Sequence, residues 1–144
     1  MTEYSTAHIH RIIGSAIYDL LVVIGLLMIA GFIAVGAYHL ITGEETIPAN
    51  SLVFQLYLLA VISGYFLYFW KRSGQTVGMK AWRIRLVNRK KEAISVKQLL
   101  IRQLVAIPAY CLLLLGVIWQ YWDKSGLNWH DHASGTKLIY IPKN

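Results

Sequence analysis

Two long uncharged stretches dominate the pattern of hydrophobic and polar positions along the chain. No Asp, Glu, Lys or Arg occurs between Asp19 and Glu44, and the stretch 52–70 contains none. A transmembrane helix needs about 20 predominantly apolar residues. The pattern therefore predicts two transmembrane helices, at 9–41 and 52–70. The first is long enough for its N-terminal turns to lie in the headgroup layer.

The charged residues are distributed unevenly between the two ends of these helices. Ten of the fourteen Lys and Arg residues lie in 71–102, where Glu92 is the single acid, whereas the connection 42–50 contains two acids and no Lys or Arg. Cytoplasmic loops of membrane proteins carry the excess of Lys and Arg. We therefore expect 71–102 and the N-terminus in the cytoplasm, and Glu44 and Glu45 outside.

Two short pieces of the polar segments have the character of β-strands. Residues 82–87 alternate apolar and basic side chains, and residues 137–141 form a second, mostly β-branched and aromatic piece. A strand needs a partner for its backbone groups. Pairing of these two pieces would place the C-terminus on the cytoplasmic side.

A third hydrophobic segment follows Ser95 and Gln98, whose spacing is that of a helix capping box. Its first turns are amphipathic, and we expect them to lie on the inner leaflet. Pro108 interrupts the apolar run. It could kink one spanning helix and leave the C-terminus outside, or it could separate the halves of a hairpin that returns to the cytoplasm. The strand-like pieces favour the hairpin.

The expected fold is a single all-α membrane domain over 1–144. It contains two full transmembrane helices and a third, proline-broken hydrophobic segment that begins as an amphipathic helix. The strand-like pieces would add a small cytoplasmic two-stranded element. The expected parts are the helices 9–41 and 52–70, a basic cytoplasmic segment at 71–95, the amphipathic and third segment at 96–122, and a tail at 123–144.

Composition supports a membrane protein and excludes several other classes. Of the 144 residues, 56% are hydrophobic, and the mean hydropathy is +0.48. Cys111 is the single cysteine, so an internal disulfide is excluded. The net charge of +7 lies beside membrane segments, which indicates anionic lipid at the cytoplasmic face as the partner and not nucleic acid.

Enzymatic and metal chemistry receive little support from the motifs. The cluster His130, Asp131 and His132 has no second ligand cluster except His8 and His10, so we expect no metal site. No cofactor fingerprint occurs, so we expect no cofactor and no enzymatic activity. The turn motif of Gly74, Gln75, Thr76 and Gly78 lacks the Gly-Lys-Ser/Thr ending of a phosphate-binding loop, and its glycines are expected to turn the chain sharply onto the membrane surface.

Four pieces of the chain together resemble the RDD family of small bacterial membrane proteins, which is named for one arginine and two aspartates. The pieces are Arg11 with Asp19, the segment 74–80, the strand-like 84–87, and 130–136. Arg11, Asp19 and Asp131 match the three charged residues of the family. The resemblance implies a multi-pass protein of the bacterial inner membrane. For some members of the family, cation–proton exchange is reported.

Each of the three charged residues has a functional and a structural interpretation. Burial in a membrane can raise the pKa of a carboxylate into the range of proton exchange, so Asp19 could carry an ion or a proton. Alternatively, Asp19 is a fixed anion paired with an arginine of the cytoplasmic segment. The candidate partners are Arg83, Arg85 and Arg102.

The other two charged residues favour structural roles. Arg11 is expected to anchor the helix end by binding lipid phosphate or Asp131. Asp131 is expected to accept hydrogen bonds from backbone amides, or to pair with Arg11 or an arginine of 83–89. The function favoured by the sequence is a small accessory subunit of a larger membrane complex, or a homo-oligomer. The alternative is a transporter that exchanges cations and protons through Asp19.

Overall fold

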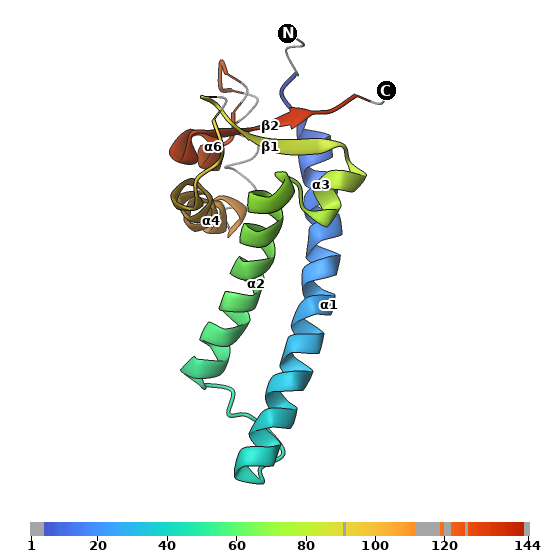
Figure 1. The fold of residues 1–144 in the computed structure, drawn as a ribbon, viewed down its shortest axis with the longest axis vertical. Coiled ribbons are helices and arrows are strands. Elements are labelled where there is room, and N and C mark those ends of the chain that lie inside the picture. Colours follow the sequence, from blue (N-terminus) through green and yellow to red (C-terminus); the bar gives the residue numbers. More distant parts are fainter. Residues whose placement is uncertain (1–4, 91, 112–118, 120–121, 126, 143–144) are drawn as a thin grey trace.

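Two long helices set the length of the molecule. The computed structural model describes residues 5–142 except 91, 112–118, 120–121 and 126. Helix α1 (Ile9–Thr42) and helix α2 (Leu52–Ser73) lie side by side and are joined at one end by a short connection (Figure 1). Both are long and apolar enough to cross a membrane. Their outer surfaces carry exposed apolar side chains, such as Phe32 (85% exposed) and Val53 (79% exposed). Such surfaces suit lipid or other helices better than water.

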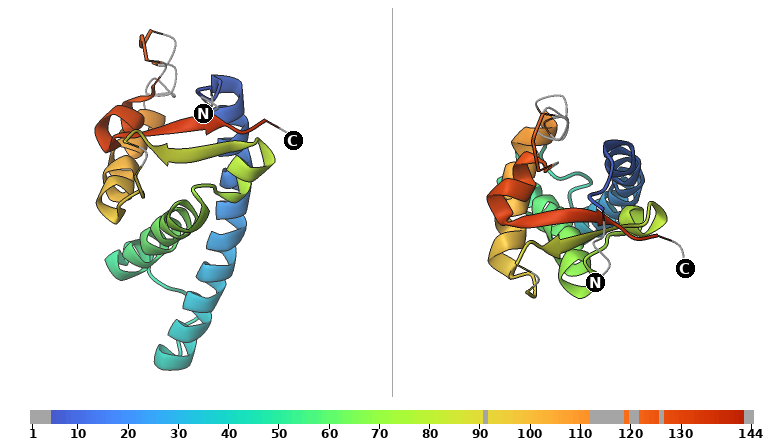
Figure 2. Two further views of the ribbon diagram at one scale, coloured as in Figure 1. Left: turned by 45° about the horizontal axis from the view of Figure 1, so that its top comes forward. Right: turned by 90° about the horizontal axis from the view of Figure 1, so that it is seen from above.

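All the remaining elements gather at the opposite end from the α1–α2 connection (Figure 1). They are α3 (Val77–Ala81), β1 (Ile84–Asn88), α4 (Val96–Cys111), α6 (Trp129–Ser134) and β2 (Thr136–Tyr140). Seen from that end, the two strands lie across the ends of α1 and α2 (Figure 2). In Figure 1, α1 and α2 run roughly vertically, whereas α4 is seen end-on. Helix α4 therefore lies crosswise to the two long helices.

The two strands form an antiparallel sheet whose edges are both covered. Leu86 of β1 lies opposite Leu138 of β2. On the outer edge of β2, the N–H of Ala7 donates to the carbonyl of Leu138 (2.9 Å). On the outer edge of β1, the N–H of Leu86 donates to the carbonyl of Gly74 (2.7 Å). Covered edges leave few unpaired backbone groups that could template further strand pairing.

A cluster of buried apolar side chains lies beneath this sheet, and Val23 and Ala30 are buried farther along α1. The cluster is built from the start of α1, the end of α2, the helices α3 and α4, and the inward faces of both strands. Burial of these side chains, at roughly 25 cal/mol per Å² of apolar surface, ties the sheet to the ends of the helices. The core residues are Ala7, Ile12, Trp70, Met79, Ile84, Leu86, Leu99 and Leu138.

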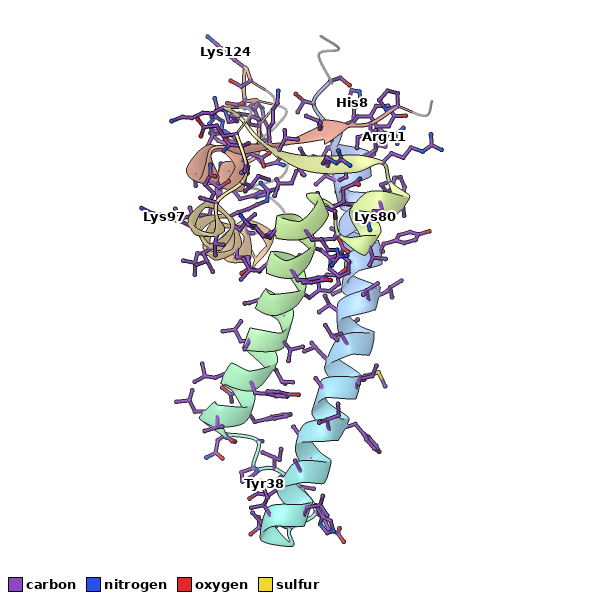
Figure 3. All side chains as sticks on the ribbon, in the orientation of Figure 1. His8, Arg11, Tyr38, Lys80, Lys97 and Lys124 are labelled. Carbon is purple, nitrogen blue, oxygen red and sulfur yellow. The ribbon has the colours of Figure 1, made fainter. Side chains whose placement is uncertain are left out.

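Basic side chains lie at the sheet end of the molecule. Arg11, Lys80, Lys97 and Lys124 all lie near the strands, whereas Tyr38 lies near the α1–α2 connection (Figure 3). The N-terminal segment and residues 71–102 therefore occupy one end, and the acidic connection occupies the other.

The element boundaries differ from the sequence expectation at three places. The short helix α3 occupies part of the expected basic loop. The expected strand 82–87 begins only at Ile84, because Trp82 ends α3 and Arg83 takes a left-handed φ of 55°, which an extended strand excludes. Helix α4 also continues past Pro108 to Cys111, so the expected break at this proline is wrong within the described part of the segment. A proline removes only one helical hydrogen bond, and the rest of the ladder can persist.

The pairing of β2 with β1 bears on the path of the third segment. Helix α4 already lies at the end that holds β1 (Figure 1), and the chain after α4 leads to the same end, because β2 lies beside β1 over five residue pairs. Residues 112–118, where the return of the expected hairpin falls, lie outside the described residues.

Candidate functional site

Asp19 lies in a buried polar junction between three helices. Its side chain projects from α1, and the residue is 5% exposed. The hydroxyl of Tyr65 in α2 donates to Oδ1 (2.8 Å), and the N–H of Gly78 in α3 donates to the same oxygen (2.9 Å). The hydroxyl of Thr76 donates to Oδ2. We call these four residues the Asp19 junction.

The junction satisfies the free amides at the start of α3. The first amides of a helix have no partner within the helix. Here the N–H of Val77 donates to the hydroxyl oxygen of Tyr65 (3.4 Å), that of Gly78 to Asp19, and that of Met79 to the side chain of Thr76 (3.2 Å). A negative charge at a helix N-terminus is favourable. Asp19 therefore attaches α3 to the membrane helices by its N-terminal turn.

The glycines of the turn motif make this contact possible. Gly74 ends α2 with a left-handed φ of 70° and turns the chain toward α3. Gly78 lies so close to α1 that a Cβ there would come within 2.2 Å of the carbonyl oxygen of Ser15. The side-chain amide of Gln75 donates to the carbonyl of Ile84 (2.8 Å) and fixes the start of β1. The motif thus turns the chain as expected, and it also brings two hydrogen-bond donors to Asp19.

The expected pairing of Asp19 with an arginine is wrong within the described residues. All of its hydrogen-bond partners there are uncharged groups. Arg83 and Arg85 are exposed, because they fall on the outward positions of the 83–88 segment. Arg102 is buried elsewhere.

Arg102 and Asp131 form a second buried polar junction. They are 3% and 1% exposed, and an Nη1 N–H of Arg102 donates to Oδ1 of Asp131. The same nitrogen lies 3.0 Å from the hydroxyl oxygen of Thr136 in β2. The guanidinium group also lies over the ring of Trp70 in α2, 5.5 Å from its centroid. We call this group of contacts the Arg102 junction.

Asp131 also caps the short helix that carries it. Its Oδ2 accepts the backbone N–H of Asn128, three residues earlier (3.2 Å). The neighbouring hydroxyl groups of Ser134 and Thr136 are 2.6 Å apart. The expectation that Asp131 accepts a backbone amide is confirmed. Its arginine partner is Arg102 of α4, and not Arg11 or an arginine of 83–89, because α6 packs on α4.

Arg11 holds the start of α1 against the sheet by uncharged contacts. Its Nη1 donates to the carbonyl of Trp82 (3.2 Å), and its guanidinium carbon lies 4.2 Å from the centre of the Tyr140 ring. A cation over an aromatic face is attracted by the ring quadrupole. The expected contact with Asp131 is not formed in the described structure.

His130 is neutral in its buried position. Burial and, secondarily, the positive charge of Arg102 lower its pKa to about 3, while Asp131 acts in the opposite direction. His132 instead lies near the surface, with Nε2 3.1 Å from Oδ1 of Asp123. Among the described residues, no three His, Cys, Asp or Glu side chains lie close enough together to hold a metal ion.

Sequence reasoning did not identify Tyr65 and Thr136 as members of the junctions, or Ser134 as the hydroxyl group beside Thr136. Tyr65 carries a hydroxyl group within an apolar span, and a buried tyrosine hydroxyl usually needs a partner. The Tyr65 hydroxyl group could therefore have been recognised from the sequence as a candidate partner for a buried polar group. Nothing in the local spacing around Thr136 pointed to Arg102, because the contact joins positions 34 residues apart.

These features define a small, mostly helical membrane protein with two apolar spans and two buried polar junctions at one end. A family model described as RDD family matches residues 6–135, and the chain belongs to this family. The resemblance drawn from the four sequence pieces is confirmed. No curated protein and no solved structure is significantly similar to the chain.

Proposed function

We propose that this RDD protein is a non-enzymatic membrane module that works by assembly, as an accessory subunit of a larger membrane complex or as a homo-oligomer. Its charged residues would hold a rigid platform at the cytoplasmic face of the inner membrane. The observation that carries this proposal is the set of donors around Asp19. The donors come from α2 and α3, so the carboxylate joins three elements.

The Arg102 junction supports the same role. It joins α4, α6, β2 and α2 through one guanidinium group. A buried ion pair is not in general a large net stabiliser, but removal of one partner leaves an uncompensated charge. Such pairs can therefore fix one arrangement of elements. Arg11 adds a third connection, because it links the start of α1 to the sheet through its contacts with Trp82 and Tyr140.

The surface of the long helices supports assembly within the membrane. Large apolar side chains of α1 and α2 are exposed along most of their length, including Met28 at 72% and Leu40 at 86%. In the membrane these side chains would meet lipid or neighbouring helices. The excess of Lys and Arg in 71–102 supports a cytoplasmic position for the platform and for the N-terminus.

Cation–proton exchange through Asp19 is the alternative function. Its support is the burial of a carboxylate in an apolar helix, which is a common location for ion and proton sites. Under this alternative the donors around Asp19 would have to release the carboxylate in each transport cycle.

Paired variants at Asp19 and Tyr65 distinguish the two functions. Asp19→Asn keeps the shape of the side chain but turns one acceptor into a donor, and Tyr65→Phe removes one donor while the carboxylate stays. Each should lower the free energy of unfolding by about 1–3 kcal/mol if the junction is structural. Thermal stability in detergent and sodium- or potassium-driven proton movement in proteoliposomes would be measured. Normal stability of Asp19→Asn, with loss of a flux that the parent and Tyr65→Phe both show, would establish the transporter.

Assembly is tested directly on the native protein. After gentle solubilisation of membranes, native mass spectrometry of the affinity-purified chain should show either a defined homo-oligomer or a stoichiometric membrane partner. A monomer without partners under several mild detergents would contradict the proposal.

A further inference from the structure

A cleft between α2 and α4 combines an apolar wall with a basic rim. Its volume is about 440 Å³, and it is lined by Leu67, Tyr68, Lys71, Arg72 and Val96. Tyr68 and Val96 are half exposed, at 55% and 51%. The cleft lies where α4 crosses the end of α2.

Contacts within the protein hold both cations at the rim. The Nζ of Lys71 donates to the carbonyl of Ile94 (3.0 Å). The Nη1 of Arg72 donates to the hydroxyl of Tyr68 (3.0 Å), and the guanidinium carbon lies 5.8 Å from the centre of that ring. Neither cation forms an ion pair with a carboxylate of the described residues. Arginine has five N–H donors and lysine three, so both retain donors for an anion.

The apolar surface extends beyond the cleft along α4. Leu100 and Leu104 are exposed at 44% and 69%, and they follow Val96 at the spacing of one helix face. A soluble anion would leave this surface uncovered. A molecule with an anionic head and a hydrocarbon chain would cover it and neutralise the rim.

We propose that this cleft binds one anionic phospholipid. The phosphate group would lie against Arg72 and Lys71, since guanidinium groups bind phosphate through paired N–H donors. An acyl chain would lie against Leu67 and Val96 and continue along Leu100. The site thus differs from diffuse attraction to a charged leaflet, because it assigns the headgroup to two residues.

The inference rests on the proposed membrane placement of the chain, with the end of α2 at the lipid headgroup level. That placement is tested separately, because an integral protein stays with the membrane during alkaline extraction whether or not the cleft binds lipid.

Two variants test the cleft without loosening the fold. Arg72→Gln removes a cation whose side-chain hydrogen bond goes to its own helix. Val96→Asp places an anion in the cleft at the first position of α4, where an acidic residue is compatible with the helix. Arg89→Gln is the matched control, because Arg89 is exposed and lies outside the cleft.

Native mass spectrometry of the full chain in detergent, with added phosphatidylglycerol or phosphatidylcholine, provides the readout. We expect the parent and Arg89→Gln to retain one phosphatidylglycerol in preference to phosphatidylcholine. Arg72→Gln and Val96→Asp should each lower that retention at least tenfold, and millimolar inorganic phosphate should not displace the lipid. Equal loss in Arg89→Gln, displacement by phosphate, or no preference between the lipids would overturn the proposal.

Discussion

Asp131 pairs with Arg102, and not with Arg11, which the sequence had offered as its partner. Both partners of the observed pair are almost fully buried. Arg11 instead contacts a carbonyl group and an aromatic ring. Arg11, Asp19 and Asp131 therefore make three separate sets of contacts at the same end of the molecule, and Arg102 is a further buried charged residue in one of them.

The Arg102 junction should behave as a coupled pair. Arg102→Met leaves Asp131 buried without its cation, and Asp131→Asn leaves Arg102 without its anion, so each should cost about 3–5 kcal/mol of unfolding free energy. The double variant should cost clearly less than the sum of the two single changes. Chemical denaturation in detergent measures all three values.

The partly exposed pair of Asp123 and His132 provides the control for that cycle. His132→Gln removes the exposed partner of this contact and leaves the backbone hydrogen bonds to Asp123 in place, so the unfolding midpoint should change little. Additive costs in the Arg102–Asp131 cycle would contradict the buried ion pair.

Gly78 should tolerate no side chain. Gly78→Ala would bring a Cβ within 2.2 Å of a backbone oxygen of α1, so the two helices must separate, at a cost of about 1–3 kcal/mol. Gly36→Ala is the matched control, since a Cβ added there would meet no heavy atom within 4 Å. That change should be neutral or should stabilise α1 by about 0.5–1 kcal/mol. Thermal unfolding of both variants checks the prediction. Equal changes in the melting temperature would contradict the close approach of Gly78 to α1.

His130 should make the protein sensitive to mild acid. In the unfolded chain an ordinary histidine has a pKa near 6.5, whereas burial and the positive charge of Arg102 lower the pKa of His130 in the folded protein to about 3. The folded state therefore binds fewer protons between these values. Stability should be fully present above about pH 6.5 and should fall as the pH decreases toward 3.

The contribution of His130 is measured from melting temperatures between pH 7.5 and 5. His130→Asn should flatten the decline in this range, and His10→Asn, at an exposed position, should leave it unchanged. If the melting temperature of His130→Asn falls with pH as steeply as that of the parent, other titrating groups cause the decline.

The sequence predicted the parts of the structure that depend on local pattern. The spans at 9–41 and 52–70 lie close to Ile9–Thr42 and Leu52–Ser73, because long apolar runs bounded by polar residues determine helix length. The capping box of Ser95 and Gln98 is confirmed, since the Gln98 N–H donates to the Ser95 hydroxyl oxygen (3.2 Å) and the Ser95 N–H to the Gln98 side chain (3.0 Å).

Contacts between distant elements could not be predicted in the same way. Ten cations near the membrane made an arginine partner for Asp19 plausible, but the close approach of α3 at Gly78 brought neutral donors there instead. Likewise, the packing of α6 on α4 selected Arg102 for Asp131. Both outcomes depend on three-dimensional packing that no local spacing encodes.

The last prediction concerns the sides of the membrane. Single cysteines replacing Glu45, Arg89 and Lys124, on a Cys111→Ala background, would be labelled with a membrane-impermeant maleimide. The connection between α1 and α2 lies at one end of the molecule, and Lys124 lies at the end that carries the sheet (Figure 3). Arg89 directly follows β1 and therefore belongs to the same end as Lys124. We therefore expect position 45 to react in intact spheroplasts, and positions 89 and 124 to react only in inverted vesicles.

Position 124 decides the path of the third segment. If the β1–β2 pairing holds in the membrane, positions 89 and 124 must react from the same side, because β2 follows position 124 closely and lies beside β1. A denatured sample, in which all three cysteines should react equally, controls for burial. Labelling of positions 45 and 124 from one side, with position 89 on the other, would mean that the segment crosses the membrane once. The two strands could not then pair within one chain.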